Sequence, residues 1–179
     1  MNNRSDHILD ELLVLGAQDG DAKSLTILVT RWHKKLVAYC YHQTNDLEVS
    51  KDLVQECWQA ILKGIGSLKD PAKFRVWAFR IVHNKAINWI RSVQRERAME
   101  EEVLYEANQP KEEDPDFGPL RRAVNRLPVD QKMTLTLFYH HDYSLKEISE
   151  ILNVSIGTVK SRLFNARQKL KENYKPLNV

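Results

Sequence analysis

The chain has 179 residues, of which 42% are hydrophobic and 28% are charged, with a formal net charge of +3 and only six glycines and six prolines. This composition excludes wholesale disorder and predicts a globular protein rich in helix, as one ordinary domain or two small ones. No apolar run reaches the roughly 18 residues that a membrane-spanning helix needs. The N-terminus lacks the basic-then-apolar layout of a signal peptide, so we expect a cytoplasmic protein.

The net charge combines four blocks of alternating sign. Residues 1–21 carry −4, residues 22–97 carry +8, residues 98–118 carry −7 and residues 119–179 carry +6. Two basic blocks separated by an acidic one suit two surfaces for a polyanion, although two ordinary solvated domains would show the same charges. Residues 98–118 also hold two prolines, a glycine and no sustained apolar period, which predicts a flexible acidic linker between two helical domains.

The first basic block predicts three principal helices, preceded by a short helix within residues 7–18. Apolar residues recur at helical spacing over residues 25–40, over residues 53–61 and along a longer helix that starts at about Phe74. The segment 63–71 before the longer helix contains two glycines and ends in an Asp-Pro pair. We therefore expect a loop there, with the helix cap at its end.

One face of the second predicted helix is acidic and amide-rich. Its members fall at offsets 0, 3, 4 and 7 and are Asp52, Gln55, Glu56 and Gln59. Such a narrow face suits docking against a basic helical partner, and an ordinary solvated face is the alternative.

The longer helix carries a basic and amide stripe opposite its apolar side. The stripe consists of Arg80, Asn84, Asn88, Arg91 and Arg95, at offsets 0, 4, 8, 11 and 15. A continuous stripe of this kind can track a nucleic-acid backbone.

The second basic block predicts four short helices. The first starts near Leu120 and ends at Pro128, and the second runs over about residues 129–138. Ser144 and Glu147 form a capping box that starts the third helix.

A helix-turn-helix follows from the pattern over residues 144–170. Ser155 suits the cap of its second helix, whose apolar residues recur at offsets 0, 4, 7 and 11 from Val159. An antiparallel helix pair with a basic solvated face would show the same pattern. The polar side can read base edges or bind phosphates, and its members are Ser155, Thr158, Lys160, Ser161, Arg162, Asn165 and Arg167.

The string from residue 144 to residue 170 resembles the final helix-turn-helix of bacterial sigma factors of the extracytoplasmic-function type, within the sigma-70 family. Residues 155–163 are especially similar, and residues 127–131 resemble an earlier part of the same domain. Residues 52–58 resemble the family's polymerase-docking segment, and residues 74–91 resemble its segment that melts and reads the −10 promoter element. The resemblances follow the family's order along the chain.

The resemblance implies an all-α, non-catalytic subunit that binds core RNA polymerase and promoter DNA. Residues 1–97 would dock on the clamp of the largest subunit through the face at 52–59, and would contact −10 DNA through Lys73 and the stripe at 80–95. Residues 119–179 would adjoin the flap and read the −35 element. The resemblance also implies an anti-sigma factor as regulator. It implies an acidic linker that mimics nucleic acid near the active site, although a solubilising tether is equally compatible.

By the same resemblance, the loop over residues 64–74 accepts a base flipped out of the −10 element. Aromatic candidates near that path are Trp77, Phe79 and Trp89, although aromatic residues at helical spacing are more often core, and Trp77 in particular is expected there.

The docking segment departs from the family's pattern at two positions. Val49 and Lys51 stand where relatives often have acids, so core affinity is expected to be weakened or conditional. Modification of the neighbouring Ser50 is one hypothesis for restoring negative charge.

The sequence offers no catalytic or metal-binding pattern. A phosphate-cradling glycine loop, a Cys-x-x-Cys pair and a His-Glu-x-x-His run are all missing. We discount the His-His-Asp run at residues 140–142 and the Cys-Tyr-His run at residues 40–42. Cys40 and Cys57 are expected to be small buried residues in a reducing compartment. We predict a non-enzyme without cofactor or metal.

Two rival interpretations remain. A free-standing helix-turn-helix regulator would leave the face at residues 52–59 unexplained. An RNA-processing or DNA-modifying enzyme with a helical DNA-binding tail would need a catalytic constellation that the sequence does not show.

Overall fold

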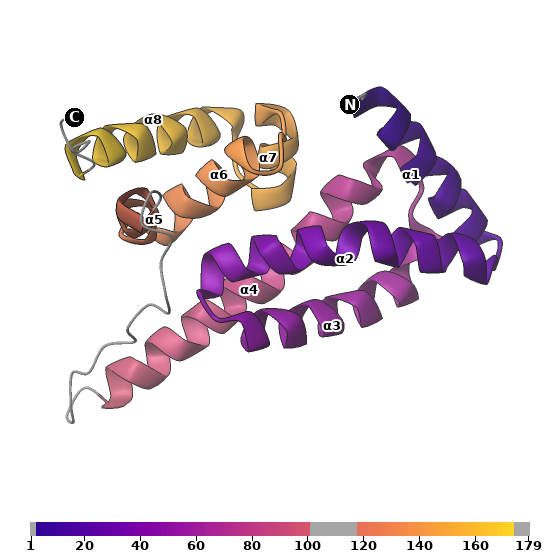
Figure 1. The fold of residues 1–179 in the computed structure, drawn as a ribbon, viewed down its shortest axis with the longest axis horizontal. Coiled ribbons are helices and arrows are strands. Elements are labelled where there is room, and N and C mark those ends of the chain that lie inside the picture. Colours follow the sequence, from indigo (N-terminus) through magenta and orange to yellow (C-terminus); the bar gives the residue numbers. More distant parts are fainter. Residues whose placement is uncertain (1–2, 101–117, 174–179) are drawn as a thin grey trace. The chain divides into compact units, whose positions relative to one another are not determined.

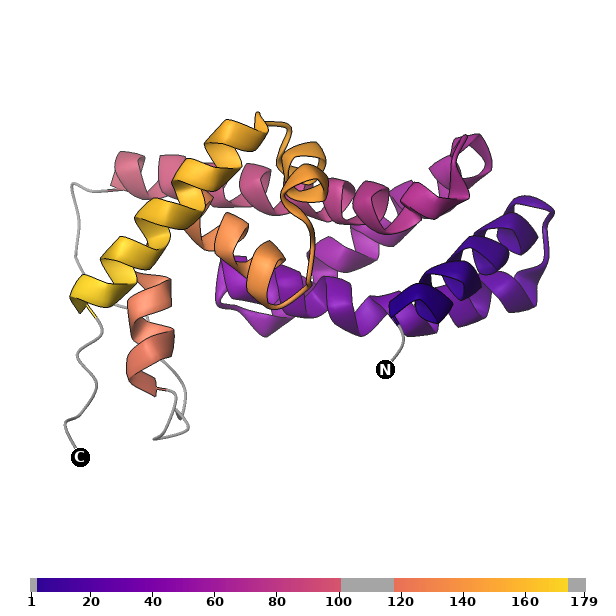
Figure 2. The same ribbon diagram turned by 90° about the horizontal axis from the view of Figure 1, so that it is seen from above.

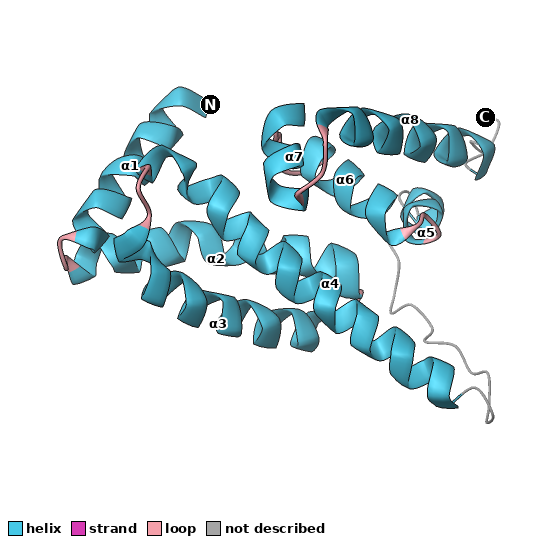
Figure 3. Ribbon diagram, turned by 180° about the vertical axis from the view of Figure 1, so that it is seen from behind, coloured by secondary structure: helices cyan, strands magenta, loops and turns pink. Residues whose placement is uncertain are grey.

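The structure, a computed structural model, describes residues 3–100 and 118–173. Within these ranges every regular element is a helix, and most connections are short (Figure 3). This confirms the all-α fold class. The described chain divides into two compact units, one formed mainly by residues up to Ile90 and the other mainly by residues from Arg91 on.

The N-terminal unit contains three long helices and one shorter helix (Figure 1). The shorter one, α1, has 16 residues and begins before the expected range of 7–18. The elements are α1 (Asn3–Gln18), α2 (Ala22–Thr44), α3 (Leu47–Gly64), the short turns η1 (Ile65–Ser67) and η2 (Pro71–Lys73), and α4 (Phe74–Glu100).

Side-chain caps set the starts of these elements. The Asp21 carboxylate accepts hydrogen bonds from the first-turn backbone of α2, and Asp46 does the same for α3. Asn45 ends α2 in the left-handed region at φ 58°, a conformation that asparagine tolerates better than most residues. Asp70 accepts from the Ala72 amide at 3.1 Å, so the expected cap lies one turn before α4 proper.

An aromatic cluster joins α2 to α4. The Trp32 ring meets the rings of Phe74 and Phe79 edge-on, with centroids 5.9 and 6.2 Å apart, and Tyr39 lies 5.3 Å from Phe79. All four side chains are buried. Edge-to-face pairs of this kind add about 0.5–1.5 kcal/mol each to the burial of their apolar area.

A buried carboxylate fastens α1 to α2. Asp10 is 8% exposed, and its Oδ1 accepts hydrogen bonds from Arg31 Nε at 3.0 Å and from the Trp32 indole N–H at 3.1 Å. Arg31 also bonds the exposed Asp6 at 3.1 Å, and this hydrogen bond lowers the pKa of the Asp6 carboxyl. The charge of Asp10 is therefore paired, as a buried charge must be.

The expected buried cysteines are confirmed. Cys40 and Cys57 are both free thiols with no exposed surface. Burial raises the pKa of Cys40 to about 11 and that of Cys57 to about 12. Both thiols are thus protonated at neutral pH, which makes them poor nucleophiles.

The C-terminal unit is built from four shorter elements, α5 (Gly118–Asn125), α6 (Val129–Tyr139), α7 (Leu145–Leu152) and α8 (Ile156–Asn173). These agree closely with the predicted bounds. Figure 2 shows α7, in orange, turning sharply into the long α8, in yellow. The core between α5, α6 and α8 consists of Leu127, Leu135 and Ala166, with Val124 and Leu170 packed against it.

The predicted domain boundaries at residues 97 and 118 stay predictions. The helix α4 continues to Glu100, and residues 101–117, most of the expected linker, lie outside the described residues. Among the described residues, no helix combines the length and apolarity that crossing a membrane requires.

We predict that Asp10→Ala lowers the free energy of unfolding of the N-terminal unit by about 2–4 kcal/mol, because two donors lose a buried charged acceptor. All four tryptophans lie at or before Trp89, so tryptophan fluorescence during urea unfolding reports this unit alone. Asp6→Ala, which removes the exposed partner of the same arginine, is the matched control and should cost much less than Asp10→Ala. Equal losses in the two variants would contradict the role of Asp10.

Candidate protein and nucleic-acid interfaces

The predicted docking face of α3 is open to solvent. Asp52, Gln55, Glu56 and Gln59 are all exposed. Glu56 differs from the others, because its Oε2 lies 2.7 Å from Lys85 Nζ of α4. The hydrogen bond to Glu56 raises the pKa of Lys85, so this carboxylate already has a cationic partner. The remaining three side chains form the available part of the face.

The face extends further along α3 than the sequence suggested. Exposed residues recur with alternating steps of four and three, and Leu62 at the end of the series is 45% exposed. This is the spacing of a seam that packs alongside another helix. The series is Glu48, Asp52, Gln55, Gln59 and Leu62.

In the structure, Lys51 and Ser50 of the docking segment both have partners within the protein. Lys51 Nζ lies 2.7 Å from Glu48 Oε1, so its charge is balanced locally. Ser50 is fully buried, and its hydroxyl bonds Thr44 Oγ1 at 2.8 Å and the backbone carbonyl of Asp46. This burial argues against modification of Ser50 in the folded protein, because a modifying enzyme needs an exposed hydroxyl.

The predicted nucleic-acid stripe of α4 is exposed along its whole length. The buried side of the same helix carries Phe79, Val82 and Ala86. Arg95 Nε donates to the backbone carbonyl of Arg91 at 3.1 Å, which orients the last arginine of the stripe. The exposed members are Lys73, just before the helix, and then Arg80, Asn84, Asn88, Arg91 and Arg95.

Hydrogen bonds from α1 hold the loop before α4. Gln18 Nε2 donates to the backbone carbonyls of Ile65 and Leu68, each at 2.9 Å. The Ser67 hydroxyl closes a local turn by donating to the Gly64 carbonyl at 2.8 Å. Sequence reasoning missed Gln18, because its two partners lie 47 and 50 positions further along the chain. No local spacing predicts contacts of that range.

The three aromatic candidates differ in how far their side chains are buried. Phe79 is 1% exposed in the core, so it cannot stack on a base without unfolding. Trp77 was expected in the core but is only half-buried, and its ring lies against Gly64. A Cβ at Gly64 would come within 2.9 Å of that ring, so glycine permits this close approach. Trp89 is also half-buried.

The helix-turn-helix has the predicted caps. Ser144 Oγ accepts from the Glu147 amide at 3.3 Å, and Glu147 Oε2 accepts from the Ser144 amide at 2.8 Å. Asn153 makes the turn in the left-handed region at φ 52°. Ser155 Oγ accepts from the Thr158 amide at 3.1 Å and thereby caps α8. The hydroxyl of Ser155 is therefore engaged in holding the helix start.

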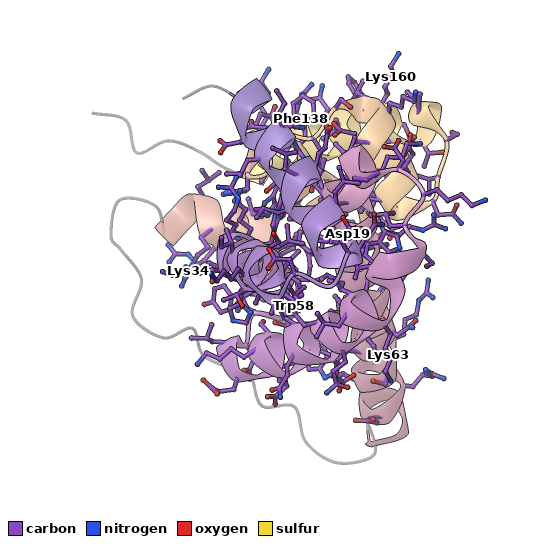
Figure 4. The ribbon with its side chains drawn as sticks, turned by 90° about the vertical axis from the view of Figure 1, so that its right-hand side faces the viewer. Asp19, Lys34, Trp58, Lys63, Phe138 and Lys160 are labelled. Carbon is purple, nitrogen blue, oxygen red and sulfur yellow. The ribbon has the colours of Figure 1, made fainter. Side chains whose placement is uncertain are left out.

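The polar side chains of α8 are in three different settings. Lys160, Ser161 and Asn165 are exposed, and Lys160 projects away from the helix into solvent (Figure 4). Arg162 and Thr158 are half-buried, and Arg162 is paired with Asp130. Arg167 is exposed and bonded to a tyrosine hydroxyl.

Sequence reasoning also missed Phe164, which is 60% exposed. It lies four residues after Lys160 and three before Arg167, on the same side of α8. An exposed ring there suits apolar contact with a base edge. The spacing could have revealed it, because Phe164 falls outside the apolar stripe that starts at Val159.

Two family models match the chain in the order that the surfaces suggest. The Sigma-70 region 2 family matches residues 28–96, and the family described as Sigma-70, region 4 matches residues 117–170. Together they cover more than half of the chain. The chain belongs to the sigma-70 family. Helix α1, including Gln18, lies outside the matched part of region 2.

The chain is similar over nearly its whole length to sigma factors of the extracytoplasmic-function group. The ECF RNA polymerase sigma-E factor of Haemophilus influenzae is 29% identical, covering 97% of this chain and 99% of the relative. Its Escherichia coli counterpart is 29% identical, with 97% and 98% covered. RNA polymerase sigma-H factor of Pseudomonas aeruginosa is 25% identical, with 94% and 95% covered.

Solved structures agree with this assignment. The sigma factor RpoE from Bartonella quintana, crystallised with the anti-sigma factor NepR, matches with a TM-score of 0.71 at 25% identity. That match covers 84% of this chain and 96% of the other. CnrH, solved with the cytosolic domain of CnrY, has the same fold, with a TM-score of 0.69 at 22% identity over 92% of this chain and 96% of that one.

The described part of the sigma factor holds no group of three His, Cys, Asp or Glu side chains that could bind a metal ion. The run at residues 140–142 is among the residues searched. Asp142 there adopts the left-handed region at φ 52°, in the connection between α6 and α7.

We predict that Gln18→Glu speeds hydrogen exchange at the Leu68 amide about 5- to 30-fold, because two hydrogen bonds worth about 1 kcal/mol each are lost from the loop. That amide is bonded to the Ile65 carbonyl at 3.1 Å. Hydrogen exchange read by NMR provides the measurement.

Gln168→Glu, the same charge change at an exposed position of α8, is the matched control and should leave Leu68 unaffected. Unchanged exchange in the Gln18 variant would show that α1 does not hold the loop.

Proposed function

We propose that this sigma factor binds core RNA polymerase and directs it to particular promoters. The observation that carries the proposal is the presence, in one chain and in the family's order, of regions 2 and 4, each with most of its predicted interface side chains exposed. Residues 1–97 act on the polymerase and the −10 element, residues 98–118 connect, and residues 119–179 act on the −35 element.

The first step is docking of α3 on the clamp of the largest subunit. The open series from Glu48 to Leu62 suits a helical partner lying alongside it. Asp52 supplies negative charge near its middle, Gln55 and Gln59 supply hydrogen bonds, and Leu62 supplies an apolar end. Glu56 acts at the edge, because it is held by Lys85. The contact between α3 and the clamp is therefore small, with polar and apolar parts. Because it carries little charge, it gives limited electrostatic steering of the encounter with the polymerase.

The second step is opening of the −10 region by α4 and the loop before it. The stripe from Arg80 to Arg95 follows the backbone of the displaced strand, and Lys73 stands at its entrance. Flipping a base out of the stack costs a few kcal/mol, which base–aromatic stacking of about 1–3 kcal/mol and edge contacts can offset. Trp77 is the aromatic group best placed for stacking, since it is only half-buried and lies beside the loop.

The third step is insertion of α8 into the major groove of the −35 element. Lys160 and Asn165 are exposed and can meet base edges, while Phe164 adds an apolar contact. The exposed Ser161 hydroxyl donates to the Thr158 carbonyl at 2.9 Å and can still accept a hydrogen bond. The fixed turn at Asn153 and the capping box at Ser144 hold the two helices in register for this contact.

The protein acts as an initiation factor and not as a catalyst, and its work at the polymerase assigns it to the bacterial cytoplasm. The Bartonella quintana relative was solved with an anti-sigma factor, and we propose that a protein of this kind also holds and releases this chain. No cofactor takes part in the three steps. A free-standing regulator would use α8 but would leave the exposed α3 series without a purpose.

The deciding experiment is a titration of the labelled full chain against sigma-free bacterial core polymerase, with unlabelled primary sigma factor as competitor. We expect saturable binding that the competitor displaces, followed by selective binding of particular promoters by the holoenzyme. Binding to DNA without binding to core would instead support the free-standing regulator.

We predict that Asp52→Arg weakens core binding at least about 10-fold, because a like charge facing a basic partner costs more than one kcal/mol. The same titration measures it. Glu56→Gln is the matched control. It removes a carboxylate already paired with Lys85, so affinity should fall by less than about 3-fold. A larger loss from Glu56→Gln than from Asp52→Arg would overturn this division of the face.

We also predict that Val49→Asp combined with Lys51→Glu strengthens core binding by about 3- to 10-fold, since it adds negative charge beside Asp52. The competition titration at two salt concentrations checks both the gain and its electrostatic origin, which salt should reduce. An unchanged affinity would mean that the family's acidic pattern at these positions does not matter here.

A further inference from the structure

Two arginines of α8 differ in their electrostatic surroundings: one contacts a carboxylate and the other contacts neutral groups. Arg162 Nη2 lies 2.6 Å from Asp130 Oδ2, and its side chain is only 22% exposed. Arg167 Nε instead donates to the Tyr139 hydroxyl at 2.9 Å. The Arg167 guanidinium carbon lies 5.6 Å from the Tyr139 ring centroid and 5.7 Å from that of Phe138. Over residues 120–172, where side chains are described, no carboxylate is paired with Arg167.

This difference decides which arginine can bind an anion. The charge of Arg162 is balanced by Asp130, so a phosphate gains less from binding it. Arg167 is held by neutral groups and keeps its full charge. Its Nε is used by Tyr139, which leaves both terminal nitrogens to bind two oxygens of one phosphate. The Tyr139 hydroxyl accepts from Arg167 and still has its own proton to donate.

The pair lies on an accessible part of the C-terminal unit. Tyr139 is 53% exposed at the end of α6, and Arg167 is exposed on α8. Lys160 and Phe164 lie on the same side of α8, seven and three residues before Arg167. A phosphate bound by the pair would therefore lie beside the part of α8 that meets base edges.

We propose that Tyr139 and Arg167 form a binding site for a backbone phosphate of promoter DNA, in which Tyr139 and Phe138 act as positioning residues. The proposal rests on the proposed function at the −35 element and adds two residues of α6 to it. Arg162 has a different task, which is to tie α8 to the start of α6 through Asp130.

The test uses holoenzyme assembled from the full chain and core polymerase, with a promoter fragment that this holoenzyme selects from a random library. Dissociation constants are measured over a range of KCl concentrations. Each phosphate neutralised by a cation contributes about 0.9 to the slope of log K against log salt. Tyr139→Glu places a carboxylate beside Arg167, so we expect affinity to fall about 3- to 10-fold and the slope to shrink by about 0.9.

Three further variants separate positioning from general damage. Arg167→Gln should reduce the slope by the same amount as Tyr139→Glu, and combining the two should add nothing further to the slope. Tyr139→Phe keeps the ring and loses the hydroxyl, so affinity should fall about 2- to 5-fold with the slope unchanged. Asp130→Asn releases Arg162 and should not reduce the slope.

The outcomes distinguish this inference from the proposed function. A wild-type holoenzyme that selects no promoter would overturn both. A wild type that binds normally, with an unchanged slope in Tyr139→Glu, would overturn the phosphate site alone, as would a slope that falls equally in the Arg167→Gln background. Thermal unfolding followed by circular dichroism checks the fold of each variant. Where Tyr139→Glu unfolds, Tyr139→Phe decides, and wild-type affinity in that variant would overturn the inference.

Discussion

The N-terminal unit depends on the position of one side chain, the indole of Trp32. Its N–H is fixed by the buried carboxylate of Asp10, and its ring is packed edge-on against Phe74 and Phe79 at the start of α4. Above it, Lys35 Nζ lies 4.5 Å from the ring centroid. Trp32 thus connects α1, α2 and α4, each of which carries or supports a functional element.

Two consequences follow for the surface proposed to bind the −10 element. Because α1 is fastened at Asp10, its C-terminal end is placed where Gln18 can hold the carbonyls of the loop before α4. Because the start of α4 is fixed by the aromatic cluster, the polar stripe opposite to that cluster faces outward along the helix. A loop held at two carbonyls loses less conformational entropy when it accepts a base than an unsupported loop would.

The sequence predicted the helices and the exposed faces well, because both follow from local spacing. The capping box at Ser144 and the turn at Asn153 are set by neighbouring residues, and the stripe on α4 by a spacing that repeats along one helix. The predictions that failed concern contacts that spacing does not carry. The hypothesis of a modified Ser50 did not anticipate its burial between α2 and the start of α3, where its hydroxyl bonds Thr44.

Local spacing also fails to predict which charged side chains are paired across the fold. By sequence alone Glu56 and Asp52 are equivalent, and so are Arg162 and Arg167. In the structure Lys85, 29 residues away, engages Glu56, and Asp130, 32 residues away, engages Arg162. Pairing across the fold therefore sorts each set into groups that stabilise the unit and groups that remain available to a partner. The available set is smaller than the net charges of the basic blocks suggest.

A small available set has a consequence for how such a protein binds. Each unit presents few unpaired charges and one helix edge, so each contact alone is expected to be weak and only modestly steered. Two units on one chain that bind the same polymerase–promoter complex convert the second contact into an intramolecular event, which raises overall affinity without new contacts. Under this arrangement any affinity that Val49 and Lys51 cost the docking segment would be recovered through the other unit. Recognition of a promoter then depends on both helix surfaces being occupied together, and a DNA that satisfies only α8 or only α4 is released quickly.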